Sequence, residues 1–109
     1  MDSGGWNYLE EVIATLVVLD ALTLPKAIGV VCRNHPSEKA DVLLLAAISF
    51  ATDLDNALGL VDEKALLLSH LRYRAIAALA ADVALLSPTE RTCNDLRDFW
   101  RSTGSVVFR

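Results

Sequence analysis

Two stretches of this chain are apolar on nearly every side when they are wound as helices. Residues 42–51 (VLLLAAISFA) contain one polar side chain, Ser49, and residues 75–86 (AIAALAADVALL) contain one, Asp82. A helix without a polar face has to be buried all round, in a core, a membrane or an oligomer. A domain of this length has a radius of gyration of only about 13 Å, so little of it lies far from the surface. The sequence therefore predicts self-association or burial against a large partner.

The composition and the charge limit the class of protein. The chain is 53% hydrophobic and 22% charged, proportions typical of a folded protein rather than a disordered one. At this length we expect a single domain over residues 1–109. The net charge is −4, so the chain lacks the basic character of duplex-binding proteins and we expect no nucleic-acid partner.

Three further features favour a cytoplasmic protein that does not enter membranes. The longest apolar runs extend over about a dozen residues, short of the roughly 20 that a bilayer-spanning helix needs. We recognise no basic and apolar leader segment at the start of the sequence. Cys32 and Cys93 show no pattern of a disulfide scaffold, so we expect reduced, partly buried thiols.

Capping and breaking residues divide the chain into helices joined by short connections. Asn7, Thr23 and Asp62 are predicted to begin helices, Gly59 is predicted to end one, and residues 87–90 (SPTE) are predicted as a capping box. Only residues 105–109 (SVVFR) are expected to be extended. The sequence thus predicts an all-α fold, an antiparallel bundle of four main helices plus one short helix. The expected helices cover residues 7–22, 24–33, 38–58, 62–86 and 88–101.

Apolar residues recur at helical spacing in the third and fourth of these helices. The two seams comprise Ala40, Leu43, Ala47, Phe50, Leu54 and Ala57, and Leu68, Leu71, Ala75, Leu79, Asp82 and Leu86. An unpaired carboxylate in such a stripe costs several kcal/mol. We expect Asp82 to form a buried or interfacial ion pair that fixes helix register. Asp20 shares the apolar face of the first helix, where it either reaches solvent or pairs with an arginine.

The fourth and fifth helices supply the predicted interface. The stretch from Arg91 onward mixes arginines with aromatic residues, a composition that is enriched at protein interfaces. Combined with the fourth-helix seam, it gives the residues that we expect to contact a second copy or another protein: Leu71, Ala75, Leu79, Asp82, Leu86, Phe99 and Trp100.

One acidic pattern indicates a different function. Glu38 and Asp41 form an E-x-x-D pattern on one helix face, followed by VLLLAAISFATDLDNA. This stretch resembles the second metal-binding helix of the MazG-like all-α nucleotide pyrophosphohydrolases. Their first motif is E-E-x-x-E, which Glu10 and Glu11 match, with Ala14 at the third acidic position. The resemblance covers about 30 residues. It implies a Mg²⁺-dependent hydrolase of nucleoside triphosphates whose metal ligands are Glu11, Glu38 and Asp41.

The residues themselves favour a function without catalysis. No nucleophile, metal or cofactor constellation is complete in the sequence, whereas apolar helical surface is in excess. We therefore expect a homo-oligomer, at simplest a homodimer, that serves as a regulatory, adaptor or immunity-type interaction protein with no catalytic residue and no cofactor. The alternative is a MazG-like enzyme or a degenerate relative that uses Mg²⁺.

Overall fold

The computed structural model describes residues 5–59, 61–89 and 91–108, and over these residues the fold is helical without any strand. The elements in chain order are α1 (Trp6–Ala14), the short π-helix η1 (Thr15–Leu19), α2 (Leu24–Asn34), α3 (Ala40–Leu58), α4 (Glu63–Ala84) and α5 (Cys93–Thr103). The sheet-like pairing is limited to one isolated bridge between Lys39 and Thr92. The all-α prediction is confirmed.

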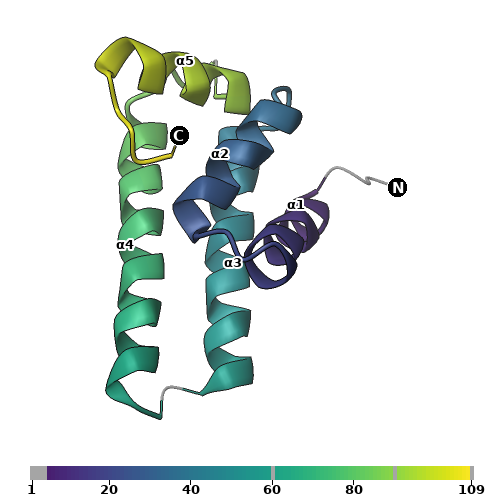
Figure 1. Ribbon diagram of the computed structural model, residues 1–109. Helices are drawn as coiled ribbons and strands as arrows, with labels where there is room; N and C mark the ends of the chain where they lie inside the picture. Colours follow the sequence, from purple (N-terminus) through teal and green to yellow (C-terminus); the bar gives the residue numbers. More distant parts are fainter. Residues whose placement is uncertain (1–4, 60, 90, 109) are drawn as a thin grey trace.

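A long antiparallel hairpin of α3 and α4 organises the molecule, as Figure 1 shows. The helices α1 and α2 pack on one side of this hairpin, α1 mainly against α3, and α2 against α5 as well as α4. The helix α5 lies across one end of the hairpin, and the tail that follows it turns back beside α2. No described helix is both long enough and apolar enough to cross a membrane.

Most helix boundaries follow the local signals in the sequence. The Thr23 hydroxyl accepts a hydrogen bond from the Lys26 amide (3.4 Å), and the Asp62 carboxylate accepts one from the Ala65 amide (2.8 Å). Both are therefore N-caps, as predicted. Gly59 ends α3 with a φ of +75°, a conformation that favours glycine. The prediction for Asn7 is wrong, because α1 begins at Trp6 after Gly5 without a side-chain cap.

The last helix begins later than its sequence signal predicts. Ser87 and Thr89 lie in the connection after α4, where their hydroxyls share a hydrogen bond of 3.1 Å, and Glu90 lies outside the described residues. The capping box that begins α5 is made by Thr92 and Asp95. The Asp95 carboxylate accepts from the Thr92 amide (3.0 Å), and the Thr92 hydroxyl accepts from the Asp95 amide (3.2 Å).

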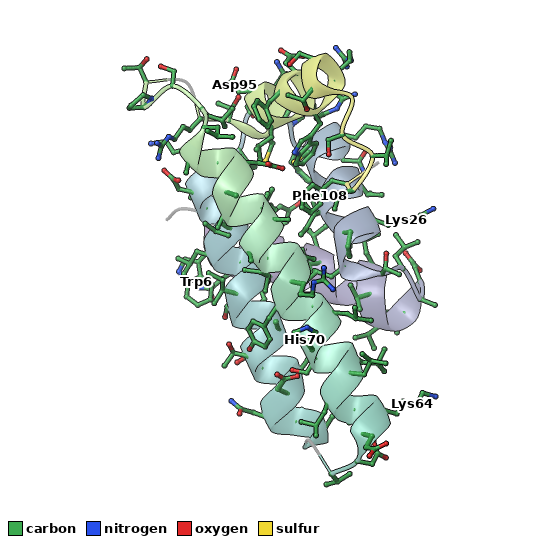
Figure 2. All side chains as sticks on the ribbon, turned by 90° about the vertical axis from the view of Figure 1, so that its left-hand side faces the viewer. Trp6, Lys26, Lys64, His70, Asp95 and Phe108 are labelled. Carbon is green, nitrogen blue, oxygen red and sulfur yellow. The ribbon has the colours of Figure 1, made fainter. Side chains whose placement is uncertain are left out.

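The tail folds onto the core instead of extending away from it. Phe108 is buried and stacks on Trp100, with ring centroids 4.8 Å apart, and Figure 2 shows it beside α2 and beneath α5. Of the residues expected to be extended, 105–106 have no regular structure, 107–108 form a turn, and Arg109 lies outside the described residues.

The core lies where α1, α2 and α5 meet the hairpin. Cys32 and Cys93 are both free and both fully buried, more completely than predicted. The largest fully buried side chains are Leu9, Ile13, Ile28, Val31, Cys32, Leu43, Leu79, Cys93 and Leu96.

Candidate functional site

The apolar seams of the hairpin continue past the helices that cover them. In α4 the seam is buried at Leu79 and Ala75 and then becomes exposed at Leu71 and Leu68. In α3 it is buried at Phe50, partly buried at Leu54 and exposed at Ala57. Figure 1 shows that neither α1 nor α2 reaches the end of the hairpin where α3 and α4 are connected. Apolar residues that form a core elsewhere in the molecule therefore face solvent at this end.

We call this region the open end of the hairpin. It comprises the last turn of α3, the described residues between α3 and α4, the first half of α4, and η1 with its connection to α2. Its large apolar side chains are exposed to between 45% and 86%, far more than the singly scattered apolar residues of an ordinary surface require. They are Val18, Leu19, Leu58, Val61, Leu66, Leu67, Leu68 and Leu71.

An apolar groove of about 480 Å³ runs between the η1–α2 connection and α4. A second hollow of about 220 Å³ adjoins it toward the hairpin connection, and both are lined by Leu68 and Arg72. Recognition of an apolar helix or side chain needs a concave apolar surface of this kind. The other residues that line the larger groove are Val17, Ala21, Leu22, Thr23, Leu24, Pro25 and Leu71.

The backbone is irregular along one wall of this groove. Residues 15–19 form a π-helix, which the Asp20 amide closes by donating to the Thr15 carbonyl (3.1 Å). In the connection that follows, the Leu22 amide donates to the Leu16 carbonyl (3.0 Å). Ala21 has a φ of +57°, which is costly for a residue with a Cβ. Single-turn π-helices and left-handed non-glycine residues both concentrate at functional sites. Here both coincide with the apolar groove.

A largely buried ion pair adjoins the groove, which it reaches through Arg72. The Arg72 guanidinium donates to one carboxylate oxygen of Asp55 (2.7 Å), and the Ser69 hydroxyl donates to the other (2.6 Å). The side chains of Arg72 and Asp55 are only 15% and 13% exposed. The hydrogen bond from Ser69 and the neighbouring Arg72 charge together hold the pKa of Asp55 below its ordinary value. Within the described residues the buried Nε of Arg72 has no hydrogen-bond partner.

A second polar contact joins α1 to α3. The Ser49 hydroxyl donates to the Glu10 carboxylate (2.9 Å), so the one polar residue of the apolar stretch 42–51 has a partner. Burial, followed by hydrogen bonding with Asp53, raises the pKa of Glu10. Glu10 and Asp53 thus form a carboxyl pair that the sequence analysis missed, because their separation along the chain carries no local signal.

The acidic residues predicted to bind Mg²⁺ do not converge. Asp41 is exposed and lies 3.8 Å from Arg91, while Glu11 is exposed on α1. The contribution of Glu38 to the fold is its backbone carbonyl, which accepts from the Cys93 amide (2.7 Å). Over the ranges that the structure describes, no three acidic, histidine or cysteine side chains gather as a metal site would require.

The residues predicted as an interface are divided by the structure. Ala75, Leu79 and Trp100 are buried within one chain, and Leu86 and Phe99 pack partly buried against the same core. Leu71 is exposed and lines the groove. These residues differ in burial because α2 and α5 cover the C-terminal part of the α4 seam and leave its N-terminal part uncovered.

The structure also shows the environment of Asp82 and Asp20, the two aspartates that the sequence places on apolar helix faces. Asp82 accepts a hydrogen bond from the Trp100 indole Nε1 (2.8 Å), so this partly buried carboxylate has a neutral donor as its partner, where an ion pair was expected. Asp20 follows η1 directly and is exposed, which agrees with the solvent-facing alternative.

Comparisons with protein-family models, with curated proteins and with solved structures find no match to this chain. The resemblance to MazG-like pyrophosphohydrolases receives no support from them.

Proposed function

We propose that this protein is a non-enzymatic helical interaction protein that forms a homodimer through the open end of the hairpin. The observation that supports this proposal is the continuation of both hairpin seams from the core into solvent. Exposed apolar surface of this extent marks a binding surface on a folded protein. Two buried free thiols fit the reducing cytoplasm, where we place a regulatory or adaptor role.

The occupant that fits the open end best is the open end of a second copy. Homodimer interfaces are richer in apolar residues than other protein surfaces, and the open end is rich in leucine. In a two-fold dimer the same patch occurs on both sides, so it has to be complementary to itself. Asp62, Glu63 and Lys64 lie together at the start of α4 and offer both signs of charge to a second copy.

Such a dimer would bring helices of two chains together, in addition to the bundle of four main helices and one short helix that the sequence predicts within one chain. Each chain contributes one α3–α4 hairpin, and two hairpins packed through their open ends bring four helices together. The leucines of one copy would then occupy the groove of the other.

Sedimentation velocity over a range of protein concentrations tests the proposal. The double variant Leu68→Gln/Leu71→Gln replaces two exposed leucines of the open end, and Leu85→Gln replaces an exposed leucine near the opposite end of α4. We expect the wild type and Leu85→Gln to dimerise with the same affinity. The double variant should sediment as a monomer, because truncating central apolar contacts weakens an interface by about 2 kcal/mol or more.

Two results would contradict the proposal. One is a wild type that remains monomeric at every concentration reached. The other is a dimer that the Leu68/Leu71 double variant leaves unchanged while Leu85→Gln breaks it. Far-ultraviolet circular dichroism of each variant establishes that the helices have formed before its sedimentation is interpreted.

A further inference from the structure

A separate hollow of about 230 Å³, which we call the arginine hollow, lies at the opposite end of the molecule from the open end. It is bounded by the last turns of α2, by α5 and by the tail that returns after α5. Three of its six lining residues are arginines. The six are Gly29, Arg33, Arg97, Trp100, Arg101 and Phe108.

The three arginines gather although little negative charge balances them. Within the described residues, neither Arg33 nor Arg97 has a carboxylate within the 4.0 Å of an ion pair. Arg101 lies 3.3 Å from Asp98, but both side chains are largely exposed and such a pair is weak. Like charges that share one hollow repel each other unless an anion joins them. The cluster is the more notable because the chain as a whole carries a net charge of −4.

Helix dipoles account for only part of this arrangement. Arg33 and Arg101 lie in the last turns of α2 and α5, where a positive charge is favoured. Arg97 lies in the middle of α5 and gains nothing from the dipole. Its position is therefore explained by neither helix end, although it lines the same hollow as Arg33 and Arg101.

The remaining lining residues keep the hollow open and rigid. Trp100 and Phe108 are stacked and almost completely buried, so the aromatic part of the wall is held in place. Gly29 lies inside α2, where glycine costs about 1 kcal/mol relative to alanine. Because it has no side chain, this lining position adds no bulk to the hollow. The hollow is smaller than the roughly 300–1,000 Å³ of sites for drug-sized ligands, so it fits a single small group.

We propose that Arg33, Arg97 and Arg101 bind one phosphoryl group, supplied by free phosphate or by a small phosphate ester. A phosphoryl group carries close to two negative charges and three strong acceptor oxygens, enough to engage several guanidinium groups at once. Guanidinium groups present paired donors that match this geometry. A carboxylate has a single charge and two oxygens, and would leave part of the cluster unbalanced.

Isothermal titration calorimetry at constant ionic strength tests this site. Inorganic phosphate and phenyl phosphate are titrated into wild-type protein, and sodium chloride serves as the control for general screening. The test variants are Arg97→Gln and Arg33→Gln. The matched control is Arg74→Gln, which removes an exposed arginine of α4 that does not line the hollow.

We expect saturable binding of phosphate to the wild type and to Arg74→Gln. Because a hydrogen bond to a charged group is lost, Arg97→Gln should weaken binding by about tenfold or more. Tighter binding of phenyl phosphate would identify an ester as the source, and equal affinity would identify free phosphate.

The proposal is overturned if neither compound binds saturably to the wild type. It is also overturned if Arg97→Gln and Arg74→Gln bind phosphate with the same affinity.

Arg33→Lys keeps the charge but not the paired donors, and should bind more weakly than the wild type. If Arg97→Gln fails to fold, Arg33→Gln and Arg33→Lys decide the question. Thermal melts with and without phosphate provide a second measure, since a bound ligand stabilises the folded state.

Discussion

The two ends of the α3–α4 hairpin are built from the same kind of seam but are covered differently. At the α5 end, α2, α5 and the tail close over the hairpin, and Leu79 is fully buried. At the open end nothing in the described chain covers the seam, and Leu71 is 47% exposed. Both leucines belong to one helix and one stripe. Residue type alone therefore does not decide burial; the position of the crossing helices does.

The aspartates at the two ends of the hairpin have different hydrogen-bond partners. At the covered end the Asp82 carboxylate is paired with the neutral indole of Trp100. At the open end Asp55 is paired with Arg72, whose Nε remains without a partner within the described residues. The aspartates of the two ends thus differ in their partners, but the Nε of Arg91 beside the start of α5 also lacks a partner within the described residues, so the ends differ chiefly in their exposed apolar surface.

The largest expected effect comes from substituting one leucine of the α4 seam by alanine at the covered end, compared with the same substitution at the open end. Leu79→Ala should lower the free energy of unfolding by about 2–5 kcal/mol, because it leaves a cavity in the core. Leu71→Ala, on the same seam, should change it by less than about 0.5 kcal/mol at concentrations where the protein is monomeric. Urea denaturation measures both. Equal losses would show that the two ends do not differ in packing.

Removing the arginine from the open-end ion pair should have the next largest effect. Arg72→Met leaves the buried Asp55 carboxylate with Ser69 as its remaining partner, and should cost about 2–3 kcal/mol of unfolding free energy. Arg74→Met, two residues further along α4, removes an exposed arginine and serves as the control. If chemical denaturation gives the same midpoint for both variants, the ion pair contributes nothing to stability.

A smaller effect is expected for the hydrogen bond between Trp100 and Asp82 at the covered end. The variants Asp82→Leu, Trp100→Phe and their combination form a double-mutant cycle. We expect a coupling free energy of about 1–1.5 kcal/mol, the ordinary contribution of one hydrogen bond. A coupling near zero would mean that the 2.8 Å contact is not maintained in solution.

The fold class could be predicted from the sequence because its signals are local. Thr23 and Asp62 cap helices through amides three residues away, so the signal and the structure lie in the same few residues. The start of α5 could not be predicted, because two capping signals compete within six residues. Backbone hydrogen bonds from Ala40 to Arg91 and from Cys93 to Glu38 favour the later one, and these connect segments distant in sequence.

The site could be predicted only in part, for a similar reason. Helical periodicity identifies the seam that contains Leu71 and Leu79, but the cover over it depends on where α2 and α5 pack. The pairing of Ser49 with Glu10 joins residues 39 positions apart, and no local pattern indicates it. The π-helix and the positive φ of Ala21 arise from the same packing and leave no recognisable motif.

The smallest expected effects concern two carboxyl groups that respond to pH in opposite directions. The lowered pKa of Asp55 contributes stability above its unfolded value near 3.8, and this contribution is lost as the pH falls through the folded value. The raised pKa of Glu10 contributes stability below its unfolded value near 4.5, which is lost as the pH rises through the folded value.

Urea denaturation between about pH 3 and about pH 7 separates the two groups. Asp55→Asn should lower stability at neutral pH and converge with the wild type in acid. The free energy of unfolding of Glu10→Gln, relative to that of the wild type, should increase as the pH rises. Parallel curves for the wild type and either variant would contradict the corresponding shift.

The central claim is that the open end of the hairpin binds the open end of a second copy. The most direct test is an isotope-filtered nuclear Overhauser experiment on a sample that mixes labelled and unlabelled protein. We predict intermolecular contacts to the methyl groups of Leu68 and Leu71, and none to those of Leu85. Intermolecular contacts confined to Leu85, or no intermolecular contacts at a concentration where sedimentation detects a dimer, would contradict the claim.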